Sequence, residues 1–299
     1  MRSRVRLLDT VVQYLLKRKG KQIRPTLVLL AAEISGGVTE RSYRAAALVE
    51  LLHTATLVHD DVVDEADTRR GVASINALWR NKVGVLLGDF LLSRGLLLAL
   101  DAGDYDLLHL TSDAVRRMSE GELLQIETAR KLDITEERYF QIIGDKTASL
   151  IASCMAAGAA SAGADDATVA RAKAIGETIG LAFQIRDDLF DYDADAAAGK
   201  PIGLDLQDRK MTLPLILALD RADDATRQRV RRIVRKRKKS RAETAEVMRF
   251  VETSGGLAAA RERMEALAAE AAEALQAFPP SEAREALVGL CAYVVARKR

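Results

Sequence analysis

Apolar residues recur along this chain at the 3.6-residue spacing of helices that bury one face. In the first such stretch they form a single stripe opposite basic residues: Leu7, Leu8, Val11, Val12, Leu15 and Leu16. Gly20 ends this helix, and Pro25 suits the first turn of a second helix that runs towards Ile34. The pattern predicts a third helix from about 39 to 67.

The same spacing predicts helices over most of the remaining chain, at about 74–100, 104–128, 135–160, 167–193, 212–220, 224–238, 242–253, 257–277 and 281–297. A polar stretch rich in Gly, Asp and Lys, from about 195 to 210, is expected to be a loop. No repeat, low-complexity linker or break in composition divides the chain. We therefore expect one large all-α domain over residues 1–299.

The composition agrees with an all-helical fold. Of 299 residues, 48% are hydrophobic but only 4% aromatic, and the helix formers Ala and Leu dominate the apolar fraction. The 45 basic and 43 acidic residues leave a net charge of +2, which argues against wholesale binding of nucleic acid. Cys154 and Cys291 have no CxxC or His-rich spacing around them, so we expect buried thiols in a reducing compartment.

No segment has the pattern of an export signal or a membrane span. The N-terminal residues lack the uninterrupted apolar core and small-residue cleavage site of a signal peptide. The segment from Val83 to Leu100 comes closest to a span, but Asp89 and Arg94 interrupt it. We therefore expect a cytoplasmic protein.

An acidic cluster lies on the third predicted helix, where residues 59–71 read HDDVVDEADTRRG. Asp60 and Asp64 are four residues apart and face the same way on a helix, with Asp61 beside them. Like charges at this spacing destabilise a helix unless something neutralises them, and Mg²⁺ typically takes one or two carboxylates together with phosphate oxygens. A solvated acidic face is the alternative, but it fits poorly with the apolar neighbours Leu57, Val58, Val62 and Val63.

The same DDxxD spacing returns in residues 183–192, FQIRDDLFDY, at Asp187, Asp188 and Asp191. Two such clusters on separate helices, each among apolar residues, are harder to explain as unrelated charged faces than one cluster alone. We interpret them as two carboxylate walls that face each other across a cavity and hold several Mg²⁺ ions around one diphosphate.

Basic residues are placed where a polyanion would need them. Lys21 and Arg24, in GKQIRP, open a helix whose first backbone N–H groups favour anions. Arginine offers phosphate a bidentate fork, and lysine offers a mobile point charge. Any one such cation would more often be a solvated surface residue, and only the joint placement predicts a diphosphate site. The further candidates are Arg69, Arg70, Lys146 with Thr147 in DKTAS, Lys200 and Lys210.

These motifs together resemble the trans-isoprenyl (polyprenyl) diphosphate synthases. The segments that carry the likeness are GKQIRP, LLHTATLVHDDVVDEADTRRG, GDF, SEGELLQ, DKTASL, FQIRDDLFDY and GKPIGLDLQDRKMTLPL. The resemblance runs from about residue 5 to the C-terminus and is greatest to the bacterial medium- and long-chain members, with octaprenyl diphosphate synthases as the obvious comparison. It implies a single helical domain of the isoprenoid synthase type, with a central substrate cavity between helices, and a homodimer.

The resemblance also implies roles for individual residues. Isopentenyl diphosphate would be bound by Lys21, Arg24, His53 and Arg70. The allylic diphosphate (dimethylallyl, geranyl or farnesyl) would be bound by Arg69, Lys146, Thr147, Gln184, Lys200 and Lys210. Three Mg²⁺ ions would be held with the diphosphate, chiefly by Asp60, Asp64 and Asp187, with support from Asp61, Asp188 and Asp191. The residues implied to be catalytic are Asp60, Asp64, Asp187, Lys146 and Lys200.

Two departures from the family pattern concern substrate affinity. The first motif has one glycine where the family often has two, and Gln22 stands where a basic residue is common. The loop reads GLDL where many relatives have a second acidic residue. His53 alone would be interpreted as a structural helical histidine, and only the resemblance makes it a phosphate ligand. His59 is expected to be structural.

No Ser, Cys or His nucleophile accompanies these motifs, which suits ionisation, condensation and elimination. Mg²⁺ would stabilise the departing diphosphate, and the double bond of isopentenyl diphosphate would attack the allylic cation. Product length would depend on cavity depth, because one helical turn of ~5.4 Å is comparable with one isoprene unit. We call the positions one and two helical turns before Asp60, where side chains would limit the depth of the cavity, its rungs: Ala55 and Thr56 form the first and Leu52 the second. The small side chains at 55 and 56 predict a product of at least about C20, as needed for quinone side chains.

The basic run RQRVRRIVRKRKKSR at 227–241 is expected to be a solvated helix near the periphery, partly balanced by Asp220, Asp223 and Asp224. The alternative is peripheral contact with an anionic membrane surface.

Three other functions remain open at this point. A short-chain farnesyl or geranylgeranyl diphosphate synthase would share every motif. A class I terpene cyclase also uses an Asp-rich motif and Mg²⁺, although the isopentenyl-binding set and the second DDxxD argue against it. A non-catalytic subunit of a heteromeric synthase should have degraded Asp motifs, whereas both are intact here.

Overall fold

The computed structural model describes residues 4–17, 20–69, 72–131, 134–193 and 203–297. The described chain is almost wholly helical, which confirms the predicted all-α class, and a two-stranded hairpin of β1 (Thr68–Arg69) and β2 (Val72–Ala73) is the exception. Its contacts form two compact units, Met1–Val115 with Ser153–Ala172, and Arg116–Ala152 with Lys173–Arg299. The single domain expected from the sequence therefore stays a prediction, and each unit is described by itself.

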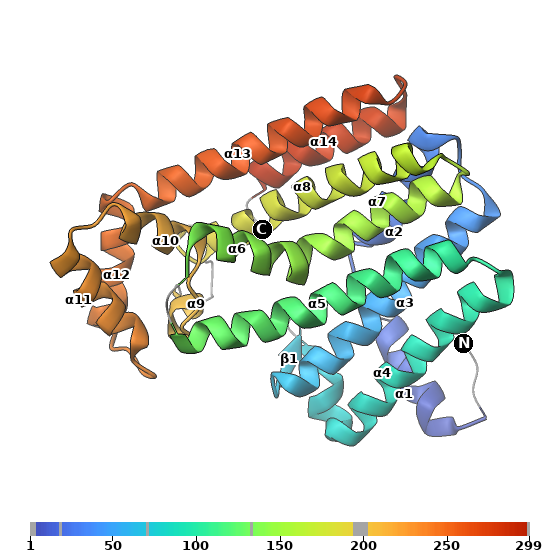
Figure 1. Cartoon of the computed structure of the whole chain (residues 1–299). Helices are drawn as coiled ribbons and strands as arrows, with labels where there is room; N and C mark the ends of the chain where they lie inside the picture. Colours follow the sequence, from blue (N-terminus) through green and yellow to red (C-terminus); the bar gives the residue numbers. More distant parts are fainter. Residues whose placement is uncertain (1–3, 18–19, 70–71, 132–133, 194–202, 298–299) are drawn as a thin grey trace. The chain divides into compact units, whose positions relative to one another are not determined.

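The first unit is built on the antiparallel pairing of two long helices. They are α3 (Glu40–Val63) and α4 (Ile75–Ala102), with α1 (Arg6–Leu16) and α2 (Ile23–Ser35) packed against them (Figure 1). Thr39 begins α3 with a capping box, because its hydroxyl accepts from the Ser42 amide while the Ser42 hydroxyl accepts from the Thr39 amide. Apolar side chains from α1, α3 and α4 share one core cluster: Val11, Val12, Ala55, Val58, Ile75, Leu87 and Leu91.

The helix that carries the first Asp motif is shorter than predicted. It ends at Val63 rather than near residue 67, because Glu65 takes a left-handed backbone (φ 49°) and the chain then enters the β hairpin. Asp64 is the C-cap residue and stays in the helical region, so the four-residue spacing from Asp60 is kept.

Helix α4 is interrupted at Arg80, whose φ of 67° is not helical. By length and composition alone α4 is able to cross a membrane, and 33% of its most apolar 18-residue stretch is buried. Core helices of soluble proteins meet the same test, so this finding adds little to the sequence pattern.

The second unit surrounds helix α10 (Leu213–Asp220). Every residue from Leu213 to Leu219 is buried, as expected for a helix that is apolar all round. It packs against α6, α12 and α13. The helices of this unit are α6 (Glu136–Ile143), α9 (Leu204–Gln207), α10, α11 (Asp224–Arg235), α12 (Arg241–Thr253), α13 (Gly256–Ala274) and α14 (Glu282–Ala296), with a 3-10 turn at Leu275–Ala277.

Three further helices contribute residues to both units: α5 (Tyr105–Lys131), α7 (Ser149–Ser161) and α8 (Asp166–Phe190). The helix predicted at 135–160 is not continuous, because a π-helical turn, η1 (Gly144–Ala148), separates α6 from α7. The predicted loop before Lys210 contains the short helix α9. These two irregularities carry candidate functional residues.

Candidate active site

The second Asp motif lies at the C-terminal end of α8. Asp187 and Asp188 occupy the last turn, and Asp191 follows the final helical residue, Phe190. Their environments differ, since the Asp187 side chain is 39% exposed while Asp188 is only 5% exposed. The three carboxylates therefore have different partners.

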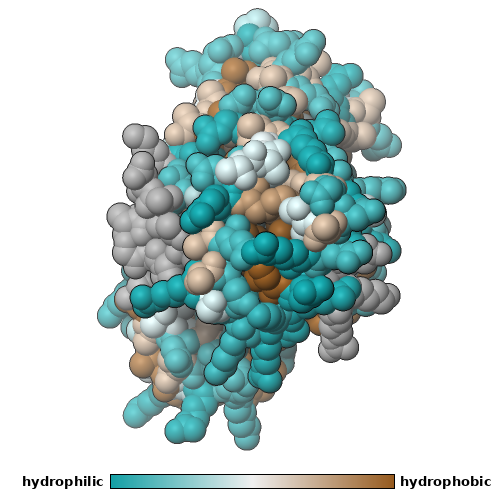
Figure 2. Space-filling view, turned by 90° about the vertical axis from the view of Figure 1, so that its left-hand side faces the viewer, coloured by the Kyte–Doolittle hydropathy of each residue, from teal (hydrophilic) through white to brown (hydrophobic). Residues whose placement is uncertain are grey.

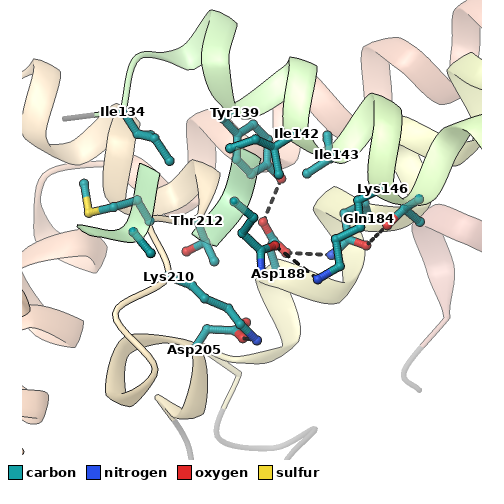
Figure 3. Close-up of a pocket in the computed structure, with 14 residues that line it drawn as sticks. Ile134, Tyr139, Ile142, Ile143, Lys146, Gln184, Asp188, Asp205, Lys210 and Thr212 are labelled. Carbon is teal, nitrogen blue, oxygen red and sulfur yellow. Dashed lines mark hydrogen bonds and ion pairs between the residues drawn. The ribbon is translucent and has the colours of Figure 1, made fainter. Parts of the chain in front are cut away.

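Asp188 is held inside the protein by two side-chain donors (Figure 3). The Tyr139 hydroxyl donates to its Oδ2 at 2.7 Å, and the Gln184 amide nitrogen donates to its Oδ1 at 3.0 Å. Gln184 in turn accepts a bond from the Thr147 hydroxyl at 2.9 Å. A continuous row of hydrogen bonds thus joins α6, α8 and η1 and fixes the orientation of each of these side chains.

Burial dominates the acid–base properties of this row. It raises the pKa of Asp188 to about 7, with the Asp205 and Asp187 charges adding to the rise and the bonds from Tyr139 and Gln184 opposing it. Burial beside the Asp188 carboxylate also raises the pKa of Tyr139 well above its ordinary value, so this phenol stays a donor. No sequence motif assigned a role to Tyr139, and only its place near DKTAS hinted at one.

Asp191 accepts hydrogen bonds from the first backbone amides of α9. Its Oδ1 accepts from the Leu204 amide at 2.8 Å and its Oδ2 from the Asp205 amide at 3.2 Å, at the start of α9. This turn places Asp205 near the motif, where its Oδ1 accepts from Lys210 Nζ at 3.0 Å. Asp205 is thus a fourth carboxylate of the cluster to which the sequence assigned no role, although it lies five residues before Lys210 in the segment GKPIGLDLQDRKMTLPL.

The π-turn η1 presents Lys146 and Thr147 because two neighbouring helices come unusually close to it. A Cβ atom added at Gly121 of α5 would lie 2.6 Å from the Lys146 amide nitrogen, and one added at Gly180 of α8 would lie 2.5 Å from Ala148 Cα. Only glycine permits both approaches. Such single turns of π-helix occur often at functional sites.

An ion-pair triad fixes the same turn. Arg117 of α5 donates to Asp145 of η1 and to Glu177 of α8, both at 2.7 Å. Lys146 Nζ donates to Gln125 at 3.3 Å and pairs with Glu122. Glu122 and Gln125 belong to the SEGELLQ segment, so that segment positions the lysine.

A cavity of about 120 Å³ opens beside these groups (Figure 3). One end is charged and polar, formed by Lys146, Gln184, Asp188, Asp205 and Lys210. The other end is mainly apolar, formed by Ile134, Ile142, Ile143 and Met211 with the ring of Tyr139. An ionic head group and a hydrocarbon tail suit these two ends.

The first unit carries the remaining candidate residues. Asp60 and Asp64, the expected chief metal ligands of this motif, are exposed, whereas Asp61, the expected supporting residue, is buried. Lys21 is exposed beside Gln22, the left-handed N-cap residue of α2, and Arg24 lies in the first turn of that helix. His53 is buried on α3.

His59 lies against α4, with Nε2 3.3 Å from the Val85 carbonyl oxygen and 3.4 Å from an Asp89 carboxylate oxygen. This placement agrees with the expected structural role. Arg70 and Lys200 lie outside the described residues, as does the side chain of Arg69. The juxtaposition of the two Asp motifs stays a prediction, because they belong to different units.

The donor set suits Mg²⁺ bound together with a diphosphate. In the described part of the chain, no three carboxylate, imidazole or thiol groups already converge on one metal position. Mg²⁺ commonly takes only one or two carboxylates and completes its shell with water and phosphate oxygens. The exposed carboxylates of Asp60 and Asp64 and the partly exposed carboxylate of Asp187 fit that mode of binding.

Comparison with known proteins decides the family. The sequence profile described as polyprenyl synthetase matches residues 5–251. The chain belongs to the polyprenyl synthetase family. As a member of it the protein is a trans-prenyltransferase, which confirms the activity class predicted from the motifs.

Two relatives illustrate the match of this polyprenyl synthetase. Octaprenyl diphosphate synthase of Escherichia coli strain K12 is 38% identical over 300 residues, which cover 100% of this chain and 93% of that protein. The crystal structure of a decaprenyl diphosphate synthase from Rhodobacter capsulatus superposes with a TM-score of 0.93 at 36% identity, covering 100% of this chain and 92% of that one. The predicted isoprenoid synthase fold is thereby confirmed, and such relatives support a medium- or long-chain enzyme.

A third relative shows what a member can bind. The crystal structure of a polyprenyl synthase from Caulobacter crescentus CB15 is described as complexed with calcium and isoprenyl diphosphate. It superposes with a TM-score of 0.89 at 35% identity and covers 100% of this chain and 92% of that one.

The buried Asp188 predicts a pH dependence of stability. A carboxyl whose pKa is raised on folding stabilises the fold while protonated, and this contribution is lost as pH rises from the ordinary value of 3.8 through about 7. Without divalent metal, the free energy of unfolding should fall between about pH 5 and 7 by roughly 1.4 kcal/mol per pH unit relative to the Asp188→Asn variant. Urea unfolding at several pH values measures the difference, and parallel curves for both proteins would contradict the assignment.

Proposed function

We propose that this protein condenses isopentenyl diphosphate with an allylic diphosphate, dimethylallyl, geranyl or farnesyl, in a Mg²⁺-dependent reaction that yields a medium- or long-chain polyprenyl diphosphate. The observation that carries the proposal is the cavity beside Asp188, with its ionic end of two lysines and two aspartates and its apolar far end. The binding of calcium and isoprenyl diphosphate by the Caulobacter relative supports it.

The chain's own residues divide the work of the reaction. Lys146 and Lys210 bind the allylic diphosphate, and the Thr147–Gln184–Asp188 row orients the groups around it. Asp60, Asp64 and Asp187 would hold Mg²⁺, which would supply Lewis acidity to the leaving diphosphate. Lys200, which lies outside the described residues, is proposed as a further cation at this leaving group.

Three bond changes complete the turnover. The allylic C–O bond breaks and leaves its electron pair on the diphosphate, and the double bond of isopentenyl diphosphate attacks the allylic cation. The new cation then loses a proton to the released diphosphate and forms the new double bond, so the reaction needs neither a protein nucleophile nor a protein base. The apolar end of the cavity, around Ile142 and Met211, keeps water away from the cation.

Product length is proposed to depend on the face of α3 that precedes Asp60. Ala55 is packed in the core cluster with Leu87 and Leu91, whereas Thr56 is only half-buried and its hydroxyl donates to the His53 carbonyl at 2.8 Å. Because Thr56 is less buried than Ala55 and Leu52, a larger side chain is accommodated most easily at this position. Leu52, one turn further, is buried.

The proposal also includes a homodimer and a cytoplasmic location. Exposed apolar residues on one side of α4, namely Val85, Leu86, Leu97 and Leu100, suit pairing with the same face of a second copy in a homodimer. We also propose a cytoplasmic enzyme.

The basic run lies on α11 and the turn after it, at the end of the second unit that Figure 2 shows as largely hydrophilic. Its apolar residues Val230, Ile233 and Val234 are buried beneath the charged face. These features favour the interpretation of the basic run as a solvated helix that makes at most peripheral contact with an anionic membrane.

The activity is tested with farnesyl diphosphate, isopentenyl diphosphate and Mg²⁺, with products sized by chromatography. The wild-type protein should make products longer than farnesyl, and Asp187→Ala should reduce the rate by at least about 100-fold with an unchanged circular dichroism spectrum, because it removes a ligand of the leaving-group metal. Turnover of the allylic substrate without isopentenyl diphosphate would instead identify a cyclase, and near-normal Asp187→Ala activity would remove the metal assignment.

Product length has its own test in Thr56→Phe. The aromatic ring should fill the first rung and shorten the main product by at least about one isoprene unit. Thr54→Phe is the matched control, since Thr54 is also half-buried on the same helix but points to another side. Equal product lengths in both variants would exclude the rung hypothesis.

The dimer is tested by sedimentation velocity of Leu97→Glu. A charge on the apolar face of α4 should convert the dimer to a monomer, because a buried unpaired carboxylate costs several kcal/mol. Tyr43→Glu, at an exposed residue of α3, is the control and should sediment as wild type. A dimer that survives Leu97→Glu would place the interface elsewhere.

A further inference from the structure

The side chain of Arg297, 110 positions after Asp187, lies on the second Asp motif. Its Nη2 donates to Asp187 Oδ1 at 2.5 Å and to the Phe183 carbonyl oxygen at 3.1 Å. Arg297 directly follows α14 and is its C-cap residue. A cation from a distant part of the sequence therefore meets the first aspartate of the motif.

Arg297 is built into this position rather than placed on the surface. Its side chain is only 8% exposed, and the guanidinium carbon lies 3.9 Å from the centre of the Phe183 ring and 5.2 Å from that of Phe190. Arg186 also donates two hydrogen bonds to the Arg297 carbonyl oxygen, at 3.0 and 2.5 Å. The residue is thus held at both its backbone and its side chain.

The contact engages only one oxygen of the Asp187 carboxylate. Among the described residues no hydrogen bond or ion pair reaches Oδ2, while the side chain as a whole is 39% exposed. Asp187 is therefore held through Oδ1, and its Oδ2 is not engaged by these residues. A carboxylate that binds a metal through one oxygen is commonly oriented by a hydrogen bond to the other.

Two roles for Arg297 predict opposite effects on metal binding. A guanidinium that occupies the metal position would have to leave, and its removal would tighten binding. A guanidinium that stays behind the carboxylate would preserve the ligand's orientation, and its removal would weaken binding. The second role is favoured because the guanidinium is held by two aromatic rings and by the Phe183 carbonyl, and because it leaves the second carboxylate oxygen of Asp187 unengaged.

We propose that Arg297 is a positioning residue that orients Asp187 for binding of a divalent cation with a diphosphate. The proposal rests on the proposed function only in taking Asp187 as a metal ligand. It extends the site to a residue outside both Asp motifs and outside every basic segment that the sequence pattern singled out.

The test measures metal binding directly. Mn²⁺ is titrated with inorganic diphosphate present and followed by electron paramagnetic resonance, for wild type, Arg297→Met and Arg297→Lys. Arg297→Met keeps the apolar stem but loses every donor, and its Mn²⁺ dissociation constant should rise about 10-fold. Arg297→Lys retains one cationic donor and should recover part of the affinity. Arg249→Met, on the exposed face of α12, is the control and should bind as wild type.

A second variant tests the proposal in case Arg297→Met fails to fold. Phe183→Leu removes the ring beneath the guanidinium and leaves both charges in place, so it should weaken Mn²⁺ binding in the same direction by a smaller factor. Melting curves establish that each variant folds. Tighter binding in Arg297→Met would show that the residue competes with the metal, and unchanged binding in folded Arg297→Met and Phe183→Leu would reduce it to a structural role; either result overturns the proposal.

Steady-state kinetics separates this proposal from the proposed function. The Mg²⁺ concentration at half-maximal rate should rise in Arg297→Met, while the KM for isopentenyl diphosphate stays unchanged. If the wild type binds Mn²⁺ with diphosphate and the variants behave as expected but no prenyl product forms, the proposed function fails and the role of Arg297 stands. If prenyl product forms and metal affinity is unaltered in the variants, only the role of Arg297 fails.

Discussion

A carboxylate removed from water must keep donors around it, and the second unit is organised around one such group, Asp188. Its two donors come from different elements, the Tyr139 hydroxyl from α6 and the Gln184 amide from its own helix. Gln184 has its second bond to Thr147, so its amide cannot rotate freely. Satisfying the hydrogen bonds of one buried carboxyl group thereby fixes the relative positions of α6, η1 and α8.

The π-turn η1 makes this arrangement possible by interrupting the regular α-helix between α6 and α7. A regular α-helix from residue 136 onwards would turn Lys146 and Thr147 to other directions, since each inserted residue rotates the downstream helix by about 100°. The glycines at 121 and 180 let α5 and α8 approach the turn, and the ion pairs of Arg117 tie the three together. The irregular element therefore places a cation and a hydroxyl side by side at the cavity.

Periodicity and motif spacing predicted the helices, the family and the residues with ionic chemistry, because those signals are local in the sequence. The end of α3 at Val63, the π-turn and the capping role of Asp191 were not predictable, because each depends on backbone bonds that a 3.6-residue pattern does not encode. Tyr139 was missed because an isolated aromatic residue carries no pattern, and Asp205, although it lies in the family segment GKPIGLDLQDRKMTLPL, was given no role of its own. Whether the two Asp motifs face one another depends on how two units meet, which no local signal records.

The contact between Arg297 and Asp187 also has a consequence for protein synthesis, since the two positions are 110 residues apart. At the usual ribosomal rate of 5–20 residues per second, about 5 to 20 s pass between the synthesis of Asp187 and that of Arg297. During this interval the newly made Asp-rich segment lacks its arginine, and its charges favour hydration over early collapse. For this interval the nascent chain therefore contains the Asp187 carboxylate without the arginine that binds it in the folded protein.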